Sequence, residues 1–424
     1  MGKKQRKDNP RVNFFKRKPM PPKKLNRVMV TWIFIITAGV MIPMLYFVIG
    51  TDHPLVIKDF QDPFIFNNGT RVSDWPDWDA RRVEIKDLLL ETEYGSMPSR
   101  PDQVQVTETS TSDLGAGKTL HLVTLTIIPN NSSPEILFNF TAWIFVPNGI
   151  GSFPAIVHVG KDGDGFNETA MDRGYLFACY QNKELDPDTE GYDTEGPAQV
   201  AYSSETWGSL AVWAWGAMRV ADYLLGEAWV DTGVAYVPSI DPGILVVTGH
   251  SRRGKTALLA GAMDERFTMV VPNGSGCGGA GSFLVQGPAC ETIAIITSSI
   301  LYKAWFKEDF GRFACKEADL PFDQHFLRAL VAPRVMLSTD SMDDFWSNPT
   351  GTQAVYDASM PVFDFLNASS HNGIHYRNGD HDFLLRDFTV LLDFADTMLR
   401  GITRDGDFYM HPYSFNAPMN YDAP

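Results

Sequence analysis

One serine, one histidine and a pair of aspartates occur along this chain in an order typical of nucleophilic acyl transfer. Ser251 follows the apolar run 243–248, Asp343 and Asp344 follow a second apolar run, and His381 comes last. A serine hydroxyl becomes a good nucleophile only when an imidazole removes its proton, and a carboxylate fixes the tautomer of that imidazole. The three residue types together predict nucleophilic acyl chemistry.

Ser251 lies on a predicted turn between a strand and a helix. The segment Gly249-His-Ser-Arg-Arg-Gly-Lys255 separates the apolar run from the helical run 256–262. A serine in such a turn is held at the edge of a sheet with its hydroxyl exposed and a helix N-terminus behind it. The usual spacing is Gly-x-Ser-x-Gly, whereas here Arg253 takes the fifth place and Gly254 follows. In the alternative interpretation, Ser251 only caps the helix.

The acid and the base each follow a later candidate strand. The order Ser, Asp, His along the chain is that of the α/β-hydrolases. Asp343 and Asp344 are both plausible acids by spacing, and either could instead cap the helix that follows. His381, like His371 and His375, could be an ordinary hydrogen-bonded loop histidine. The prediction is therefore that one hydroxyl, one imidazole and one carboxylate converge at the edge of the sheet.

The distribution of apolar residues predicts the sheet that would position this group. Two alternating segments predict antiparallel strands, whereas later runs are short, wholly apolar and separated by helical patterns, as in buried parallel strands. In open α/β sheets the chemistry lies at the carboxyl ends of such strands. The predicted class is a three-layer α/β-hydrolase fold with a mostly parallel central sheet. Its expected strands are 120–128, 142–147, 154–160, 175–180, 244–249, 269–272 and 334–339, and its expected helices include 81–93, 210–225 and 390–399.

The N-terminal region predicts a membrane anchor. Residues 1–27 contain eleven Lys or Arg and one Asp, a net charge of about +10. Because the whole chain has a net charge of −15, the remaining residues together carry about −25. Residues 28–50 are uncharged, apolar and long enough to cross a bilayer. Because the cations precede this span, the tail is expected in the cytosol and the remainder in the lumen or outside the cell. Secretion after cleavage of a signal peptide is the alternative.

The remaining composition supports one large domain beyond the membrane. We expect a linker over 51–80, the hydrolase domain over 81–404 and a C-terminal coil over 405–424. The basic tail is explained by topology or anionic lipid, so no nucleic acid partner is expected. Four cysteines allow at most two disulfides, no metal-ligand spacing is present, and five glycosylation sequons begin at Asn68, Asn130, Asn139, Asn167 and Asn367.

Beyond these patterns, the chain resembles the glucuronoyl esterases, carbohydrate esterase family fifteen, in the branch also found in bacteria. The similarity covers roughly residues 75–400. The set of motifs is more specific than any one member, and Ser-Arg-x-Gly-Lys has the family's own spacing at the serine turn. The motifs are Trp78, Tyr94-Gly95, Asp186-Pro187-Asp188, Trp207-Gly208, Ser251-Arg252-Arg253-Gly254-Lys255, Gly276-Cys277-Gly278-Gly279, Ala332-Pro333-Arg334 and Asp344-Phe345-Trp346.

The resemblance implies a role for each matched residue. Ser251 would be the nucleophile and His381 the general base and then acid. Arg252 would stabilise the oxyanion, next to backbone N–H groups. The remaining three roles concern the sugar: Lys255 and Glu291 would bind it, and Trp346 would line the pocket that holds it. The alternatives are a structural ion pair for Arg252, a helix surface charge for Lys255 and core packing for Trp346.

One departure from the family concerns the acid. Many members have a catalytic glutamate shortly after the strand that follows the serine, but residues 272–276 contain no carboxylate. The acid must then come from the later strand, and Asp344 is chosen over Asp343.

The expected function is that of a membrane-anchored serine esterase that hydrolyses carboxylic esters of uronic acid sugars in a polysaccharide, without a metal or organic cofactor. One alternative is a sugar acyl or acetyl esterase with the same triad. Another is an inactive hydrolase fold that serves as a binding ectodomain, which the missing glutamate favours.

Overall fold

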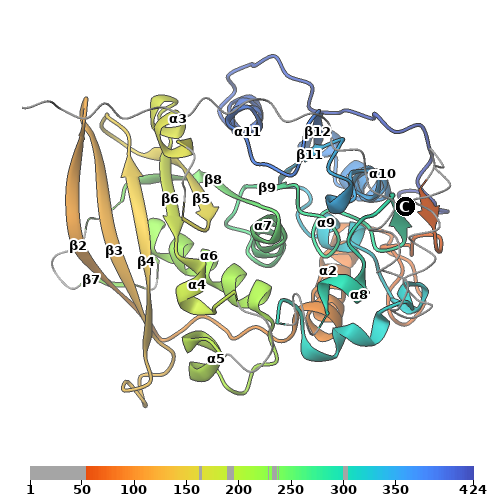
Figure 1. Cartoon of the computed structure of the whole chain (residues 1–424), viewed down its shortest axis with the longest axis horizontal. Coiled ribbons are helices and arrows are strands. Elements are labelled where there is room, and N and C mark those ends of the chain that lie inside the picture. Colours follow the sequence, from red (N-terminus) through yellow and green to blue (C-terminus); the bar gives the residue numbers. More distant parts are fainter. Residues whose placement is uncertain are drawn as a thin grey trace, which may run out of the picture.

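A sheet of ten strands forms the centre of the described residues, which in this computed structural model are 54–161, 165–188, 195–227, 229–231, 236, 238–298 and 304–424. Its order is β12-β11-β9-β8-β5-β6-β4-β3-β2-β7 (Figure 1). Neighbours from β12 to β6 run parallel, whereas β6, β4, β3 and β2 pair antiparallel, as the sequence predicted for a mostly parallel sheet. The strands are β2 (Gln103–Gly115), β3 (Lys118–Ile128), β4 (Phe138–Val146), β5 (Phe153–Val159), β6 (Leu176–Tyr180), β7 (Trp229–Asp231), β8 (Ile240–His250), β9 (Met269–Asn273), β11 (Val335–Ser341) and β12 (Asn372–Arg377).

The parallel strands are buried on both faces. In β5, Ala155 and Val157 belong to one apolar cluster, whereas Ile156 between them belongs to another on the opposite face. This alternation follows from the two-residue period of a strand. Covered faces on both sides explain why these strands are wholly apolar.

Helices cover each face and give three layers (Figure 1). Helices α6 (Ser209–Leu224) and α7 (Arg252–Met263) pack against the first cluster, and α3 (Phe166–Asp172) and α11 (Leu385–Leu399) pack against the second. All residues of α6 are buried, as expected for a helix enclosed on every side. The other helices are α2 (Trp75–Leu89), α4 (Asn182–Leu185), α5 (Pro197–Ala201), α8 (Ile293–Ile296), α9 (His325–Ala329) and α10 (Pro349–Phe365), with a π-helical turn at Leu90–Tyr94.

The segment before the sheet differs from the expected linker over 51–80. Phe60, Phe64 and Val72 are buried, and β1 (Leu55–Val56) pairs with β10 (Val285–Gln286). Helix α2 begins at Trp75 and not at residue 81, because the Asp74 side chain accepts a hydrogen bond from the Asp77 amide at 2.9 Å. The linker prediction is therefore corrected from residue 54 onward, since this segment is part of the folded domain.

The chain termini bear on two further predictions. Among the described residues, no helix combines the length and the apolar character that a membrane crossing requires. The predicted tail, 1–27, and the predicted span, 28–50, lie outside the described residues. Residues 405–424 form the expected coil, which is held to the domain by a bridge from Tyr409 to Ile374 and by the buried Tyr421.

The four cysteines are free thiols in this structure. Cys179, Cys277 and Cys290 are buried, and Cys315 is exposed. The sequence allowed up to two disulfides without fixing any pairing.

Candidate active site

Ser251 occupies a sharp turn between β8 and α7. Its backbone has φ 57° and ψ −126°, a conformation that non-glycine residues rarely adopt and that is often found at functional sites. A Cβ added at Gly249 would lie 2.4 Å from the Arg253 carbonyl oxygen, and one at Gly254 would lie 2.8 Å from the Asn273 carbonyl oxygen. The close approach therefore requires glycine at 254, one place later than in the usual pattern.

His381 and Asp344 are in direct contact at the carboxyl ends of β12 and β11. His381 Nδ1 lies 2.5 Å from Asp344 Oδ2, and Asp344 Oδ1 accepts a hydrogen bond from the Ser347 amide at 3.3 Å. Burial raises the pKa of Asp344, but the hydrogen bonds from His381 and Ser347 outweigh it and hold the pKa below its ordinary value. The carboxyl group is thus an ionised acceptor for the imidazole.

Asp343, the other candidate acid, makes a different contact. Its Oδ2 accepts a hydrogen bond from the Gly379 amide at 2.8 Å, and its side chain is exposed. The geometry therefore favours Asp344 as the acid and gives Asp343 the task of holding the loop before His381.

A buried ion pair fixes the loop that presents His381. Arg377 Nε lies 2.8 Å from both carboxyl oxygens of Asp387, at the start of α11. Arg377 also donates to the carbonyl oxygens of Asp380, at 3.2 Å, and Asp382. Because these carbonyls flank His381, the guanidinium sets the path of the chain around the imidazole.

The contact between Ser251 and His381 remains a prediction. The His381 ring lies with its centroid 4.6 Å from that of His250, the residue before Ser251, so the imidazole is beside the serine turn. With Nδ1 bonded to Asp344, Nε2 is the nitrogen left to accept the serine proton. Ser251 Oγ makes no hydrogen bond with any described residue, and such bonds often form only when substrate is bound.

Arg252 is held beside the serine turn by an ion pair. Its guanidinium donates to both Asp188 oxygens, at 3.0 and 2.9 Å, and lies 4.6 Å from the centre of the Trp305 ring. Burial raises the pKa of Asp188, but Arg252 and Trp305 outweigh it and lower the pKa. The ion pair that was the alternative for Arg252 is therefore present, and Asp188 orients the guanidinium. The oxyanion role stays a prediction.

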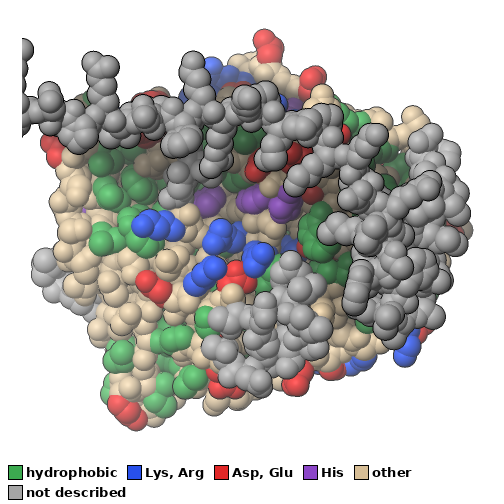
Figure 2. Space-filling view, viewed as in Figure 1, with side chains coloured by type: hydrophobic (Ala, Val, Ile, Leu, Met, Phe, Trp, Pro, Cys, Tyr) green, Lys and Arg blue, Asp and Glu red, His purple; other side chains and the backbone are tan. Residues whose placement is uncertain are grey.

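Cations gather on this face of the molecule. Figure 2 shows a group of Lys and Arg side chains directly beside a group of His side chains. Two of the described cations, Lys183 and Arg252, share Asp188 as a partner. Such a surface suits a substrate that is rich in oxygen atoms.

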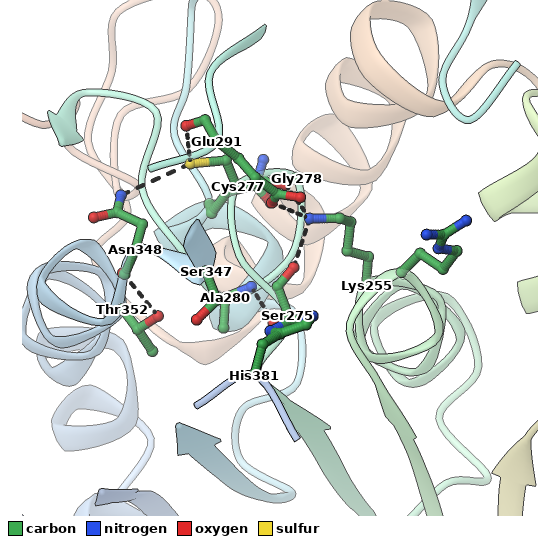
Figure 3. A network of polar contacts seen from close by, with 12 residues as sticks. Lys255, Ser275, Cys277, Gly278, Ala280, Glu291, Ser347, Asn348, Thr352 and His381 are labelled. Atoms are coloured by element: carbon green, nitrogen blue, oxygen red, sulfur yellow. Dashed lines mark hydrogen bonds and ion pairs between the residues drawn. The ribbon is translucent and has the colours of Figure 1, made fainter. Parts of the chain in front are cut away.

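Lys255 and Glu291 form a buried ion pair next to the site (Figure 3). Lys255 Nζ donates to Glu291 Oε2 at 2.5 Å and to the carbonyl oxygens of Ser275, at 2.6 Å, and Cys277, at 2.7 Å. An ammonium group has three hydrogens, so all are engaged by the protein. The alternative of a surface charge is wrong, because Lys255 is 1% exposed. A direct bond from Lys255 to sugar would have to replace one of these contacts.

Glu291 and Trp346 are joined through the backbone. The Glu291 amide donates to the Trp346 carbonyl oxygen at 3.0 Å. Burial raises the pKa of Glu291 against the opposing effect of Lys255. Trp346 is 38% exposed, so the alternative of core packing is wrong and its ring is available as a wall.

Three residues that hold the site together were not predicted: Asp188, Trp305 and Asn273. Asp188 belongs to the motif Asp186-Pro187-Asp188, but no role was assigned to it from the sequence. Trp305 packs on Arg252 and donates to Asp188 at 3.3 Å, and Asn273 accepts the Ser251 amide at 2.9 Å. The signal for Asn273 was its place at the end of the strand after the serine. Trp305 follows no recognisable pattern.

We expect Lys255→Met to destabilise the protein by about 3 kcal/mol, because removal of one partner leaves a buried charge unpaired. Urea unfolding measures the loss. The variant Lys255→Met/Glu291→Gln removes both charges and should recover part of it. Equal stability of Lys255→Met and the wild type would show that the pair is not buried as described.

Among the described residues, no group of three or more His, Cys, Asp or Glu side chains is arranged to hold a metal ion.

Comparison with known proteins places this geometry in a family. The family model described as glucuronyl esterase, fungi, matches residues 131–367, which is more than half of the chain. A 4-O-methyl-glucuronoyl methylesterase of Podospora anserina is 29% identical over 77% of this chain, and the chain spans 64% of that protein. A carbohydrate esterase of an unknown prokaryotic organism is 28% identical over 80% of this chain and 89% of its own length.

A solved structure supports the same assignment. The carbohydrate esterase family 15 glucuronoyl esterase of Caldicellulosiruptor kristjansonii is 30% identical, with a TM-score of 0.73, and the alignment covers 87% of this chain and 98% of that one. The strand order, the serine turn and the paired His381 and Asp344 are thus found in a chain that belongs to the glucuronoyl esterase family.

Proposed function

We propose that this protein is a serine esterase that hydrolyses carboxylic esters of uronic acid sugars through Ser251, His381 and Asp344. The observation that supports it most is the 2.5 Å contact between His381 and Asp344 beside the strained turn of Ser251. The similar proteins are named as methylesterases of 4-O-methyl-glucuronoyl groups, which gives the substrate class.

Acylation begins at Ser251 Oγ. As Oγ bonds to the ester carbonyl carbon, its proton moves to His381 Nε2, and the imidazolium is stabilised by Asp344 through Nδ1. Negative charge develops on the former carbonyl oxygen. The amide of Arg252 at the start of α7 and its Asp188-oriented guanidinium are fixed donors on that side.

Collapse of this intermediate completes the reaction. The C–O bond to the alcohol breaks, and His381 gives its proton to the leaving oxygen. Water then attacks the acyl carbon as His381 removes its proton. The bond from Ser251 Oγ to the acyl carbon breaks, His381 returns the proton to Oγ, and the uronic acid is released. No redox change occurs in either half.

Recognition of the sugar falls to the surface beside the nucleophile. The exposed ring of Trp346 lines one side of the substrate pocket. Glu291 is 3% exposed and its Oε2 is held by Lys255, so its second oxygen, Oε1, is the atom proposed to accept a sugar hydroxyl. Lys255 contributes mainly by orienting Glu291, since its hydrogens already have protein acceptors.

We also propose that residues 28–50 anchor the protein as a single-pass membrane protein, with the basic tail in the cytosol and the esterase in the lumen or outside the cell. The apolar span and the preceding cations support this orientation. Four of the five sequon asparagines, Asn68, Asn130, Asn139 and Asn367, are exposed, which agrees with it.

The full-length chain should hydrolyse methyl 4-O-methyl-glucuronate faster than it deacetylates xylan. Acid release under matched conditions measures both rates. Faster deacetylation would favour an acyl esterase. Absence of turnover, together with no labelling of Ser251 by a serine-reactive phosphonate, would favour a binding ectodomain.

A further inference from the structure

The imidazole of His250 lies against the imidazole of His381. Their centroids are 4.6 Å apart with the planes tilted by 43°, and His250 also stacks with Phe383 at 6.2 Å and 22°. Phe383 is buried and lies two residues after His381. The ring of His250 therefore contacts the loop of the general base on the side of the serine turn.

Asn273 fixes the orientation of His250. Its Oδ1 lies 2.7 Å from His250 Nδ1, and its Nδ2 donates to Thr339 Oγ1 at 2.9 Å and to the Thr339 carbonyl at 3.2 Å. Because the amide nitrogen is engaged by Thr339, the amide oxygen must face the ring, and His250 Nδ1 is the donor. The Asn273 carbonyl also accepts the Ser251 amide. One residue of β9 thus holds both the nucleophile's backbone and the neighbouring imidazole.

The surroundings keep His250 neutral. Burial, and then the proximity of His381, lower the pKa of His250 to about 4 against the opposing effects of Asn273, Asp344 and Asp382. A neutral ring packs against His381 without adding a second positive charge when His381 takes up the serine proton.

Gly274 lies next to this group, and a side chain there would be in ordinary van der Waals contact with it. A Cβ at Gly274, where φ is +48°, would lie 3.4 Å from His250 Cε1 and 3.7 Å from Asp344 Oδ2. In the stretch 272–276, where the family often has a glutamate, this chain thus packs His250 and Asp344 against a bare backbone.

We propose that His250, held by Asn273, is a positioning residue that keeps the His381 imidazole aligned between Asp344 and Ser251. This inference rests on the proposed function for the choice of substrate. The contacts of His250 with His381 and Asn273 do not depend on it. It assigns a role to a side chain that touches no reacting atom and acts through the general base.

The test compares variants that keep or remove the ring. His250→Ala should lower kcat for methyl glucuronate by about 10- to 100-fold with KM within about twofold, because a displacement of about 1 Å in a reacting group costs about 100-fold. His250→Phe retains an aromatic ring against His381 and Phe383 and should recover most of kcat. Asn273→Ala should lower kcat in the same direction. His371→Ala, at the opposite end of β12, is the matched control.

A second readout does not depend on the sugar. The rate at which a phosphonate probe labels Ser251 should fall in His250→Ala by the same factor as kcat, and recover in His250→Phe. If the wild type is labelled but does not cleave methyl glucuronate, the proposed substrate fails while the labelling series still tests the positioning role.

Three results would overturn the proposal. Unchanged kcat and labelling in His250→Ala would show that His381 needs no support. A raised KM with unchanged kcat would make His250 a substrate contact. Equal loss in His250→Phe and His250→Ala, with both variants folded, would place the role in the ring nitrogens. Should His250→Ala not fold, His250→Phe and Asn273→Ala decide between these results.

Discussion

Ser251→Ala will reduce turnover of methyl glucuronate by about 10⁴-fold or more, because removal of the nucleophile leaves only binding and oxyanion stabilisation. The acyl-enzyme cannot form without Oγ, so phosphonate labelling should vanish as well. Steady-state release of acid by the purified full-length chain measures the first effect, and intact mass after labelling measures the second.

The same variant should remain folded. Ser251 Oγ has no hydrogen bond to a described residue, and alanine is little more strained than serine at φ 57°. The free energy of unfolding is therefore expected to change by less than about 1 kcal/mol. A large loss of stability, or retained turnover, would contradict the assignment of Ser251 as nucleophile and would require another residue to take that role.

The parallel part of the sheet could be predicted because its strands are buried on both faces and are therefore short, uninterrupted apolar runs. The β2 strand could not be predicted in this way. Only Val104 and Val106 are buried in its first half, and the rest, TETSTSDLG, is almost wholly polar. Its strand conformation depends on pairing with β3 and not on burial.

The N-terminal segment shows the same limit. Residues 54–72 contain Asp, Asn and Gly in proportions typical of a linker, yet Phe60 and Phe64 insert into apolar clusters built largely from residues far away along the chain. Local composition contains no information about such distant partners. The prediction of a linker over 51–80 was therefore reasonable from the sequence and wrong for the described residues of that segment.

The site residues could be predicted by type, but their contacts could not. Lys255 and Arg252 lie one helical turn apart at the start of α7, and sequence assigns both to the substrate. In the fold, Lys255 is directed into the protein toward Glu291, whereas Arg252 pairs with Asp188. Both outcomes depend on where loops 186–188 and 275–291 pass, and no local pattern determines that.

The choice between Asp343 and Asp344 leads to the sharpest test of the triad. Asp344→Asn keeps the shape of the side chain but changes its hydrogen bonding. The Ser347 amide donates to Oδ1, so the new amide must keep its oxygen there and turn its nitrogen toward His381 Nδ1. That nitrogen is a donor, which forces the proton of His381 onto Nε2 and removes the lone pair that Ser251 needs. We expect kcat to fall by about 10⁴-fold, the cost of the wrong tautomer in a triad of this kind.

Asp343→Asn is the matched control, because it makes the same chemical change one residue away. The side-chain oxygen that this variant retains can still accept the Gly379 amide, so the loop before His381 should keep its path and kcat should stay within about threefold. Measured side by side, the two variants separate an effect on His381 from a general effect of charge removal near the site. Retained activity in Asp344→Asn, or equal losses in both, would mean that the His381 imidazole draws its support from another group. The carboxyl of Asp344 is the described acid in contact with that ring. The role proposed for Asp344 would then be wrong, whereas the role proposed for Ser251 would not be affected.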